Sequence, residues 1–170
     1  SYFMHRQTML LAALAFTTAL SAPAALAQQA SETTDNREIV VTGRSLKDTA
    51  DALAACLARG CPPDEDIAAT LAHAENQFIS GEYDGARTTL LKSLGRNRKH
   101  GQAYPVPVSD LLRANSRVAL HMGEGKNFQL SVLDMRDTLK KGVGADDPRT
   151  LVAQIEVGDS RAKLGHPEEA

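Results

Sequence analysis

Apolar side chains recur every three or four positions from residue 45 onward, which is the spacing of helices with one buried face. Glycine and proline divide this stretch into six predicted helices. For five of them the sequence suggests an apolar face, made of the following sets: Leu46, Ala50, Leu53 and Leu57; Ile67, Leu71, Ala74 and Phe78; Tyr83, Ala86, Leu90 and Leu94; Phe128, Val132, Met135 and Leu139; Leu151, Ile155 and Ala162. The pattern predicts an all-α fold.

Several residues mark where these helices begin. Ser45 followed by Asp48 predicts a capping box, and Asp64 is a candidate cap for the second helix. Asp147 before Pro148 is a strong start signal for the last helix, since proline fits the first helical position. Prolines within 105–107 predict a loop over 96–108, with the next helix opening at Ser109.

The first 27 residues differ from the rest. Residues 8–27 carry no charge and end in Ala25-Leu26-Ala27, the pattern that signal peptidase accepts. We predict that residues 1–3 lie upstream of the start and that cleavage follows residue 27; an uncleaved anchor is the alternative. Membrane contact is then limited to the signal peptide, and the expected location is the periplasm.

The predicted mature chain is mildly acidic. Cleavage removes one basic and no acidic residue, which leaves 18 basic and 21 acidic side chains and a net charge of −3. That charge argues against nucleic-acid binding. Aromatic residues make up only 4% of the chain and Trp is absent, which favours closely packed helices over a β-sandwich.

Three glycines recur at equal intervals. Gly123 follows Gly81 by 42 positions, Gly165 follows Gly123 by 42, and a small residue precedes each by seven: Ala74, Ser116 and Gly158. Such a period indicates a stacked array of helix pairs. The alternative is a non-repetitive bundle.

The stretch "AHAENQFISGEYDGARTTLLKSL" (72–94) resembles a tetratricopeptide repeat, with Ala74, Gly81, Tyr83 and Ala86 in register. The second unit departs from the family, with Gly125 and Phe128 at the third and fourth of these positions. The resemblance implies an α-solenoid over 64–170 whose third unit is truncated. We therefore expect the chain to be the N-terminal part of a longer protein.

Cys56 and Cys61 are the two cysteines, in "CLARGC". Their spacing fits neither a redox CxxC nor a zinc pair. If Gly60 ends the helix of residues 45–60, the two positions touch in a Schellman motif, so we predict a disulfide; two separate thiols are the alternative.

No residue set points to catalysis, a cofactor or a metal. The five histidines form no HExxH or close pair with an acid, and no GxSxG elbow is present. The basic run "KSLGRNRKH" (92–100) is interpreted as a solvated helix end, with an acidic partner as the alternative. We expect a protein that is not an enzyme.

Residues 28–44 are predicted to be disordered or extended. Within them "EIVVTGR" (38–44) resembles the N-terminal segment of TonB-dependent receptors, which implies strand addition to an energy transducer; a flexible tether is the alternative.

The sequence favours an exported helical-repeat scaffold that binds a protein or peptide. In the resembled family the first helices of each pair line the binding face, which makes the following residues candidate contacts: Glu75, Gln77, Arg113, Arg117 and Gln154. The alternative is an accessory region of an envelope enzyme or TonB-type protein whose functional domain lies beyond residue 170.

Overall fold

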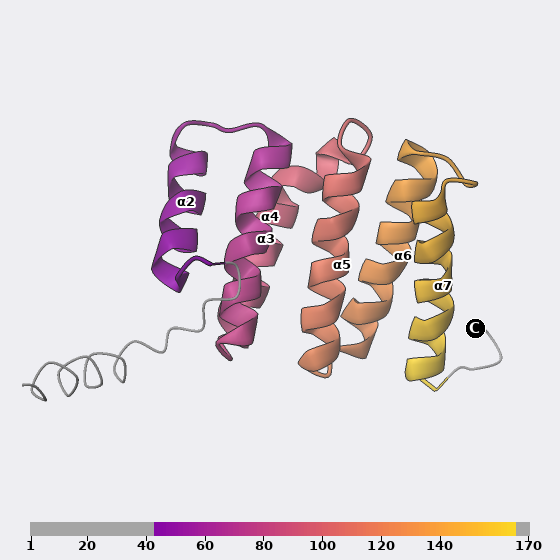
Figure 1. Ribbon diagram of the computed structural model, residues 1–170. Helices are drawn as coiled ribbons and strands as arrows, with labels where there is room; N and C mark the ends of the chain where they lie inside the picture. Colours follow the sequence, from indigo (N-terminus) through magenta and orange to yellow (C-terminus); the bar gives the residue numbers. More distant parts are fainter. Residues whose placement is uncertain (1–42, 166–170) are drawn as a thin grey trace, which may run out of the picture. The chain divides into compact units, whose positions relative to one another are not determined.

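The computed structural model describes residues 43–165, and every regular element in this range is helical. The six α-helices of this range are α2 (Leu46–Ala58), α3 (Pro63–Ile79), α4 (Tyr83–Asn97), α5 (Pro105–His121), α6 (Gly125–Gly142) and α7 (Pro148–Lys163), with a 3-10 turn η1 (Arg98–His100) after α4 (Figure 1). The predicted all-α fold is confirmed for these residues. The predicted signal peptide, the segment 28–42 and residues 166–170 lie outside the described range.

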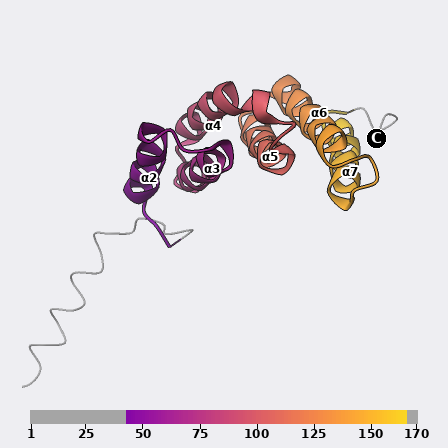
Figure 2. The same ribbon diagram turned by 90° about the horizontal axis from the view of Figure 1, so that it is seen from above.

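The helices follow one another in a curved row. Each helix packs against the next in the chain, and α3 also contacts α5. Seen from above, α3, α5 and α7 form one layer and α4 and α6 form the other (Figure 2). The row bends so that α3, α5 and α7 lie on its inner side. We call the exposed side of these three helices the inner face.

The core runs between the two layers. Large aliphatic residues fill it from both sides, including Ile67, Leu90, Leu111, Leu112, Met135 and Leu139. Ala74 of α3 and Ala86 of α4 are both buried where these two helices meet. Small side chains at a crossing allow two helix backbones to approach closely.

Two predicted helix starts are confirmed. The Ser45 hydroxyl accepts from the Asp48 N–H, and the Asp48 carboxylate accepts from the Ser45 N–H, which completes the capping box of α2. At α7, Asp147 accepts from the Arg149 N–H at 2.9 Å, and Pro148 is the first helical residue.

Two other helix starts were predicted too late. α3 begins at Pro63, so Asp64 lies inside the helix instead of capping it. α5 begins at Pro105, four residues before Ser109, and the predicted loop over 96–108 shrinks to a few residues. The reason is the same in both cases: the first helical turn needs no N–H donors, so proline begins the helix there instead of preventing it.

The end of α2 carries the predicted disulfide. Cys56 and Cys61 are joined, with their Cα atoms 5.1 Å apart. The Cys61 N–H donates to the Cys56 carbonyl at 3.0 Å, and Gly60 has a φ of 65°. This is the Schellman geometry, which brings the two cysteine side chains together at the helix end.

The ends of α3 and α5 share one backbone geometry. Gly81 and Gly123 have φ values of 81° and 75°. The Glu82 N–H donates to the Gln77 carbonyl, and the Glu124 N–H donates to the Ala119 carbonyl, both at 2.8 Å. The corresponding glycine after α7, Gly165, has a φ of 83°.

The predicted apolar face of α7 is not the face that is buried. Leu151, Ile155 and Ala162 are exposed, whereas the side toward α6 buries a different set: Thr150, Ala153, Val157 and Ser160. The periodicity correctly identified an apolar stripe on α7. That stripe, however, is not the one that α6 covers. Which stripe is covered depends on where α6 lies, and that is a tertiary property.

Candidate functional site

The inner face carries charged residues at corresponding places on its three helices. Glu75 of α3, Arg117 of α5 and Asp159 of α7 are all exposed. Glu75 stands two positions before Gln77, which faces α4; two positions are about 200° apart on a helix, so Glu75 points away from α4. The two predicted contacts Glu75 and Arg117 are therefore accessible on the inner face.

Gln77, a third predicted contact, is not accessible. Its side chain is 9% exposed, and its carbonyl accepts from the Thr89 hydroxyl of α4 at 2.8 Å. Its amide nitrogen lies beneath Gly85, where an added Cβ would come within 2.8 Å of it. Gln77 was predicted to be an exposed contact on the first helix of its pair, but it lies on the side of α3 that packs against α4.

Arg113 and Gln154 hold neighbouring helices together. Arg113 of α5 is half-buried; its Nε lies 3.1 Å from a carboxylate oxygen of Glu156 in α7, and its Nη1 lies 3.0 Å from Asp110. Gln154 is exposed, and its carbonyl accepts from Arg136 of α6 at 2.9 Å. The charge of Arg113 is thus used to connect α5 to α7.

A cleft of about 220 Å³ opens on the inner face between α5 and α7. Apolar atoms of Val106, Leu139 and Val152 form much of its wall, and charged groups stand among them. The full lining consists of Val106, Ser109, Asp110, Arg113, Leu139, Pro148, Arg149 and Val152. We call this space the α5–α7 cleft.

The polar groups of the α5–α7 cleft are mostly engaged within the protein. The Ser109 hydroxyl donates to the Val106 carbonyl at 2.7 Å, and the Arg149 guanidinium pairs with Asp147 at 2.9 Å. Burial raises the pKa of Asp110, although Arg113 and Arg117 oppose this. The cleft therefore offers an apolar wall with one half-buried carboxylate, which suits an apolar side chain next to a hydrogen-bond donor.

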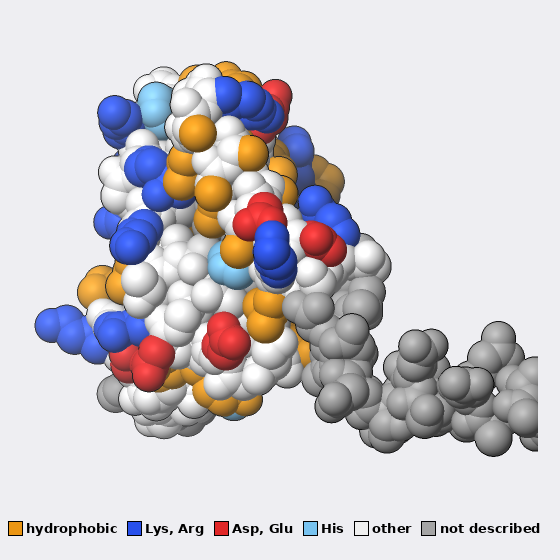
Figure 3. Space-filling view, turned by 90° about the vertical axis from the view of Figure 1, so that its left-hand side faces the viewer, with side chains coloured by type: hydrophobic (Ala, Val, Ile, Leu, Met, Phe, Trp, Pro, Cys, Tyr) orange, Lys and Arg blue, Asp and Glu red, His pale blue; other side chains and the backbone are white. Residues whose placement is uncertain are grey.

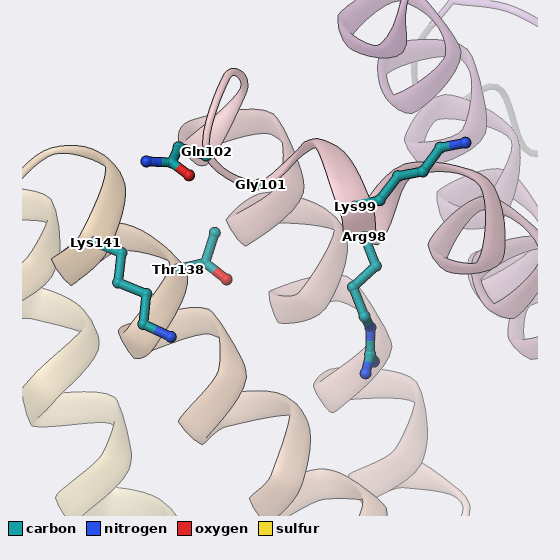
Figure 4. Close-up of a pocket in the computed structure, with 6 residues that line it drawn as sticks. All are labelled: Arg98, Lys99, Gly101, Gln102, Thr138 and Lys141. Carbon is teal, nitrogen blue, oxygen red and sulfur yellow. The ribbon is translucent and has the colours of Figure 1, made fainter.

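A second cleft, of about 400 Å³, lies where the η1 turn faces the end of α6 (Figure 4). Arg98, Lys99 and Lys141 contribute to its lining, but Figure 4 shows the Arg98 and Lys99 side chains pointing in different directions. Arg98 also lies 3.5 Å from Asp134. These cations sit at the C-terminal ends of α4 and α6, where helix dipoles favour them. That position is sufficient to explain the basic run at 92–100, and no bound ligand is needed to account for it.

The contact between α2 and α3 contains several polar pairs. The Thr49 hydroxyl lies 3.0 Å from His73 Nδ1, and the Asn76 amide donates to the Arg44 carbonyl at 3.1 Å. Burial lowers the pKa of His73, which favours its neutral form. At this end of the row, hydrophobic side chains form a strip with charged side chains of both signs around it (Figure 3). The exposed residues of α2 include Ala54, Leu57 and Ala58.

Sequence reasoning missed one buried cluster. The carboxylate of Asp66, near the start of α3, is buried and accepts from Arg96 Nε, Arg96 Nη2 and Asn97 Nδ2, each at 2.8 Å. The only local hint is Thr70, one turn later, whose hydroxyl donates to Asp66 at 3.1 Å. The Arg96 and Asn97 partners come from the far end of α4.

Within residues 43–165, no group of three or more histidine, cysteine or acidic side chains is placed to hold a metal ion. In the same range, no helix combines the length and the apolar character that a membrane span requires.

Comparisons of the chain with protein-family models, with curated proteins and with solved structures find no match. The inner face and the α5–α7 cleft are therefore the features that bear on the function.

Proposed function

We propose that this chain is an exported scaffold of tetratricopeptide-like helix pairs whose inner face binds an extended segment of a protein partner. The α5–α7 cleft is the observation that carries this proposal, because it combines an apolar wall with charged groups on the concave side of the row. Clefts of this kind hold one anchoring side chain while neighbouring polar groups orient the peptide.

The pattern of burial supports the repeat. The buried positions of α3 are Asp66, Ile67, Thr70, Ala74, Asn76 and Gln77. Each is followed 42 positions later by a residue that is buried in α5: Val108, Ser109, Leu112, Ser116, Val118 and Ala119. The turn glycines at 81, 123 and 165 share a positive φ at the same interval. A common register of buried positions is expected when two helix pairs are copies of one packing unit.

Two features support export. The disulfide between Cys56 and Cys61 is of the kind that persists in oxidising compartments. The small-residue motif at 25–27 follows an uncharged stretch, as signal peptidase requires. A periplasmic scaffold has both.

A binding role accounts for the cleft better than catalysis does. The Ser109 hydroxyl, the one hydroxyl group in its lining, donates within α5. The Arg113 charge is shared between Asp110 and Glu156. Both groups stabilise the helices around the cleft.

The test is selection of peptides from a displayed library of random 12-residue sequences. Selected peptides should carry an apolar anchor, and Val152→Asp should weaken their binding at least tenfold, since a carboxylate in the wall would have to be desolvated. Leu91→Asp and Leu130→Asp are matched controls, because these leucines are exposed on α4 and α6 outside the inner face. Both should bind like the wild type. Peptides that are lost with the controls but retained by Val152→Asp would contradict the proposal.

Export is tested in a separate experiment. A negative result there leaves the peptide-binding measurement unaffected. In a Gram-negative host the mature protein should begin at Gln28, and a thiol probe should label neither cysteine until the protein is reduced. Intact-mass detection of the leader in the periplasmic product, or two labels before reduction, would contradict export.

A further inference from the structure

α7 has an apolar stripe that no described residue covers. Leu151, Ile155, Gly158 and Ala162 follow one another at spacings of four, three and four, so they share one side of the helix. Leu151 is 53% exposed and Ile155 is 65% exposed. We call these four residues the outer stripe of α7. It lies apart from the α5–α7 cleft, whose contribution from this helix is Pro148, Arg149 and Val152.

The corresponding positions of α3 show what such a stripe does when it is covered. The residues 84 positions earlier are Ile67, Leu71, Ala74 and Phe78, and all are buried or partly buried in the core. Both α4 and α5 pack against α3. Ile67 is 1% exposed, whereas its counterpart Leu151 is 53% exposed. The outer stripe therefore has the composition of a helix-packing surface.

The order of residues along the outer stripe makes it complementary to itself. It reads large, large, small, small, so an antiparallel second copy places Ile155 against Gly158 and Leu151 against Ala162. Packing a large side chain over a small one lets two helices approach closely. The flanking positions avoid like charges in this arrangement, since Asp159 stands opposite Gln154. A parallel pair would instead place Asp159 beside its own copy.

We propose that two copies of this chain associate through the outer stripes of α7, antiparallel about a two-fold axis. α7 has 16 residues, which corresponds to a length of about 24 Å. Two such helices bury less than the roughly 1,200 Å² of a standard stable interface. The dimer should therefore depend on concentration and dissociate on dilution.

The first test is sedimentation equilibrium over a range of concentrations. The wild type should pass from one chain to two, and Ile155→Asp should raise the dissociation constant at least tenfold, because its carboxylate would be buried between copies. The variant should keep its helicity, since Ile155 is exposed in the monomer. Leu130→Asp is the control for adding a carboxylate at another exposed aliphatic side chain, and it should dimerise like the wild type. Leu57→Asp, at the α2 end of the row, should do so too.

The second test establishes the direction of pairing. Both native cysteines are in the disulfide, so a single introduced cysteine reports on the interface alone. In the antiparallel dimer, position 155 lies about 4.5 Å along the helix axis from its copy and position 151 about 16 Å from its copy, at 1.5 Å per residue. Ile155→Cys should therefore cross-link on oxidation, and Leu151→Cys should not.

Each other outcome overturns the proposal. A wild type that stays monomeric at high concentration would show that a second copy does not cover the outer stripe. Association that is lost with both Leu57→Asp and Ile155→Asp would indicate head-to-tail stacking of α7 on α2, and association that is lost with Leu57→Asp alone would indicate an interface at α2. Equal cross-linking at both positions would indicate parallel helices.

Discussion

At the scale of single residues, the buried carboxylate of Asp66 is the strongest polar feature of the described chain. Its oxygens accept hydrogen bonds from Arg96, Asn97 and Thr70. Burial by itself would raise the pKa of Asp66, but the hydrogen bonds from Arg96 and Asn97 outweigh it, and the pKa of Asp66 is lowered. The ionised form thus links the start of α3 to the end of α4.

We predict that Asp66→Ala lowers the free energy of unfolding by about 2–3 kcal/mol, because it removes several hydrogen bonds to a charged group and leaves the Asn97 amide with only its bond to Ser93. Urea denaturation at neutral pH measures this. The control is Asp64→Ala, which removes an exposed carboxylate from the same turn and should change stability by less than about 0.5 kcal/mol.

The loss of stability in Asp66→Ala should depend on pH and become smaller in acid. A carboxylate whose pKa is lowered by folding stabilises the protein above its unfolded pKa of about 3.9, and this stabilisation is lost as the pH falls through the folded value. The gap in stability between wild type and Asp66→Ala should therefore narrow below about pH 4. A gap that stays constant into strong acid would mean that packing, not charge, is what Asp66 contributes.

At the scale of elements, the glycine after α3 has a backbone conformation that restricts which residue can replace it. Gly81 has a φ of 81°, and an added Cβ would meet no atom within 4 Å. Gly95, inside α4, also has open space around it but has an ordinary helical backbone. The two glycines therefore differ in backbone conformation and not in crowding.

We predict opposite effects at these two positions. Gly81→Ala should destabilise the protein by roughly 1 kcal/mol, because an L-residue is strained at positive φ. Gly95→Ala should stabilise it by roughly 0.5–1 kcal/mol, because alanine loses less backbone entropy in a helix. Thermal or urea unfolding compares the pair. Equal destabilisation by both would mean that neither effect comes from the backbone.

At the scale of the whole molecule, the two ends of the row are held less firmly than its middle. α7 packs against α6 on one side and leaves its outer stripe exposed, and α2 packs against α3 with polar pairs in the contact. α3, α4 and α5 each pack against two or more other elements. Local opening should therefore be easiest at the ends.

We predict that, in dilute protein, amides in residues 148–163 exchange with solvent faster than those in residues 64–95. Hydrogen exchange followed by mass spectrometry measures this, with the α5 and α6 peptides as internal references. Protection of α7 should rise with protein concentration if a second copy covers it. Protection of α7 equal to that of α3 in dilute protein would contradict the uneven stability.

Local residue patterns were enough to predict the helices, most of their ends and the disulfide. The reason is that these depend on residues within about one turn of each other: Ser45 and Asp48 cap α2 across three positions, and Cys56 and Cys61 meet across one Schellman turn. Prolines 63 and 105 misled the prediction, because the same residue can end one helix or begin another.

Which helix faces are covered and which polar groups are paired depends on the packing of distant segments. Gln77 and Glu75 are both polar and two positions apart, yet one is buried against Thr89 and the other is exposed on the inner face. Asp66 accepts hydrogen bonds from Arg96, which is 30 positions away in the chain. The apolar Ile155 is exposed, whereas the polar Thr150 is buried. Each of these outcomes depends on where a neighbouring helix lies, and no local pattern of residue types contains that position.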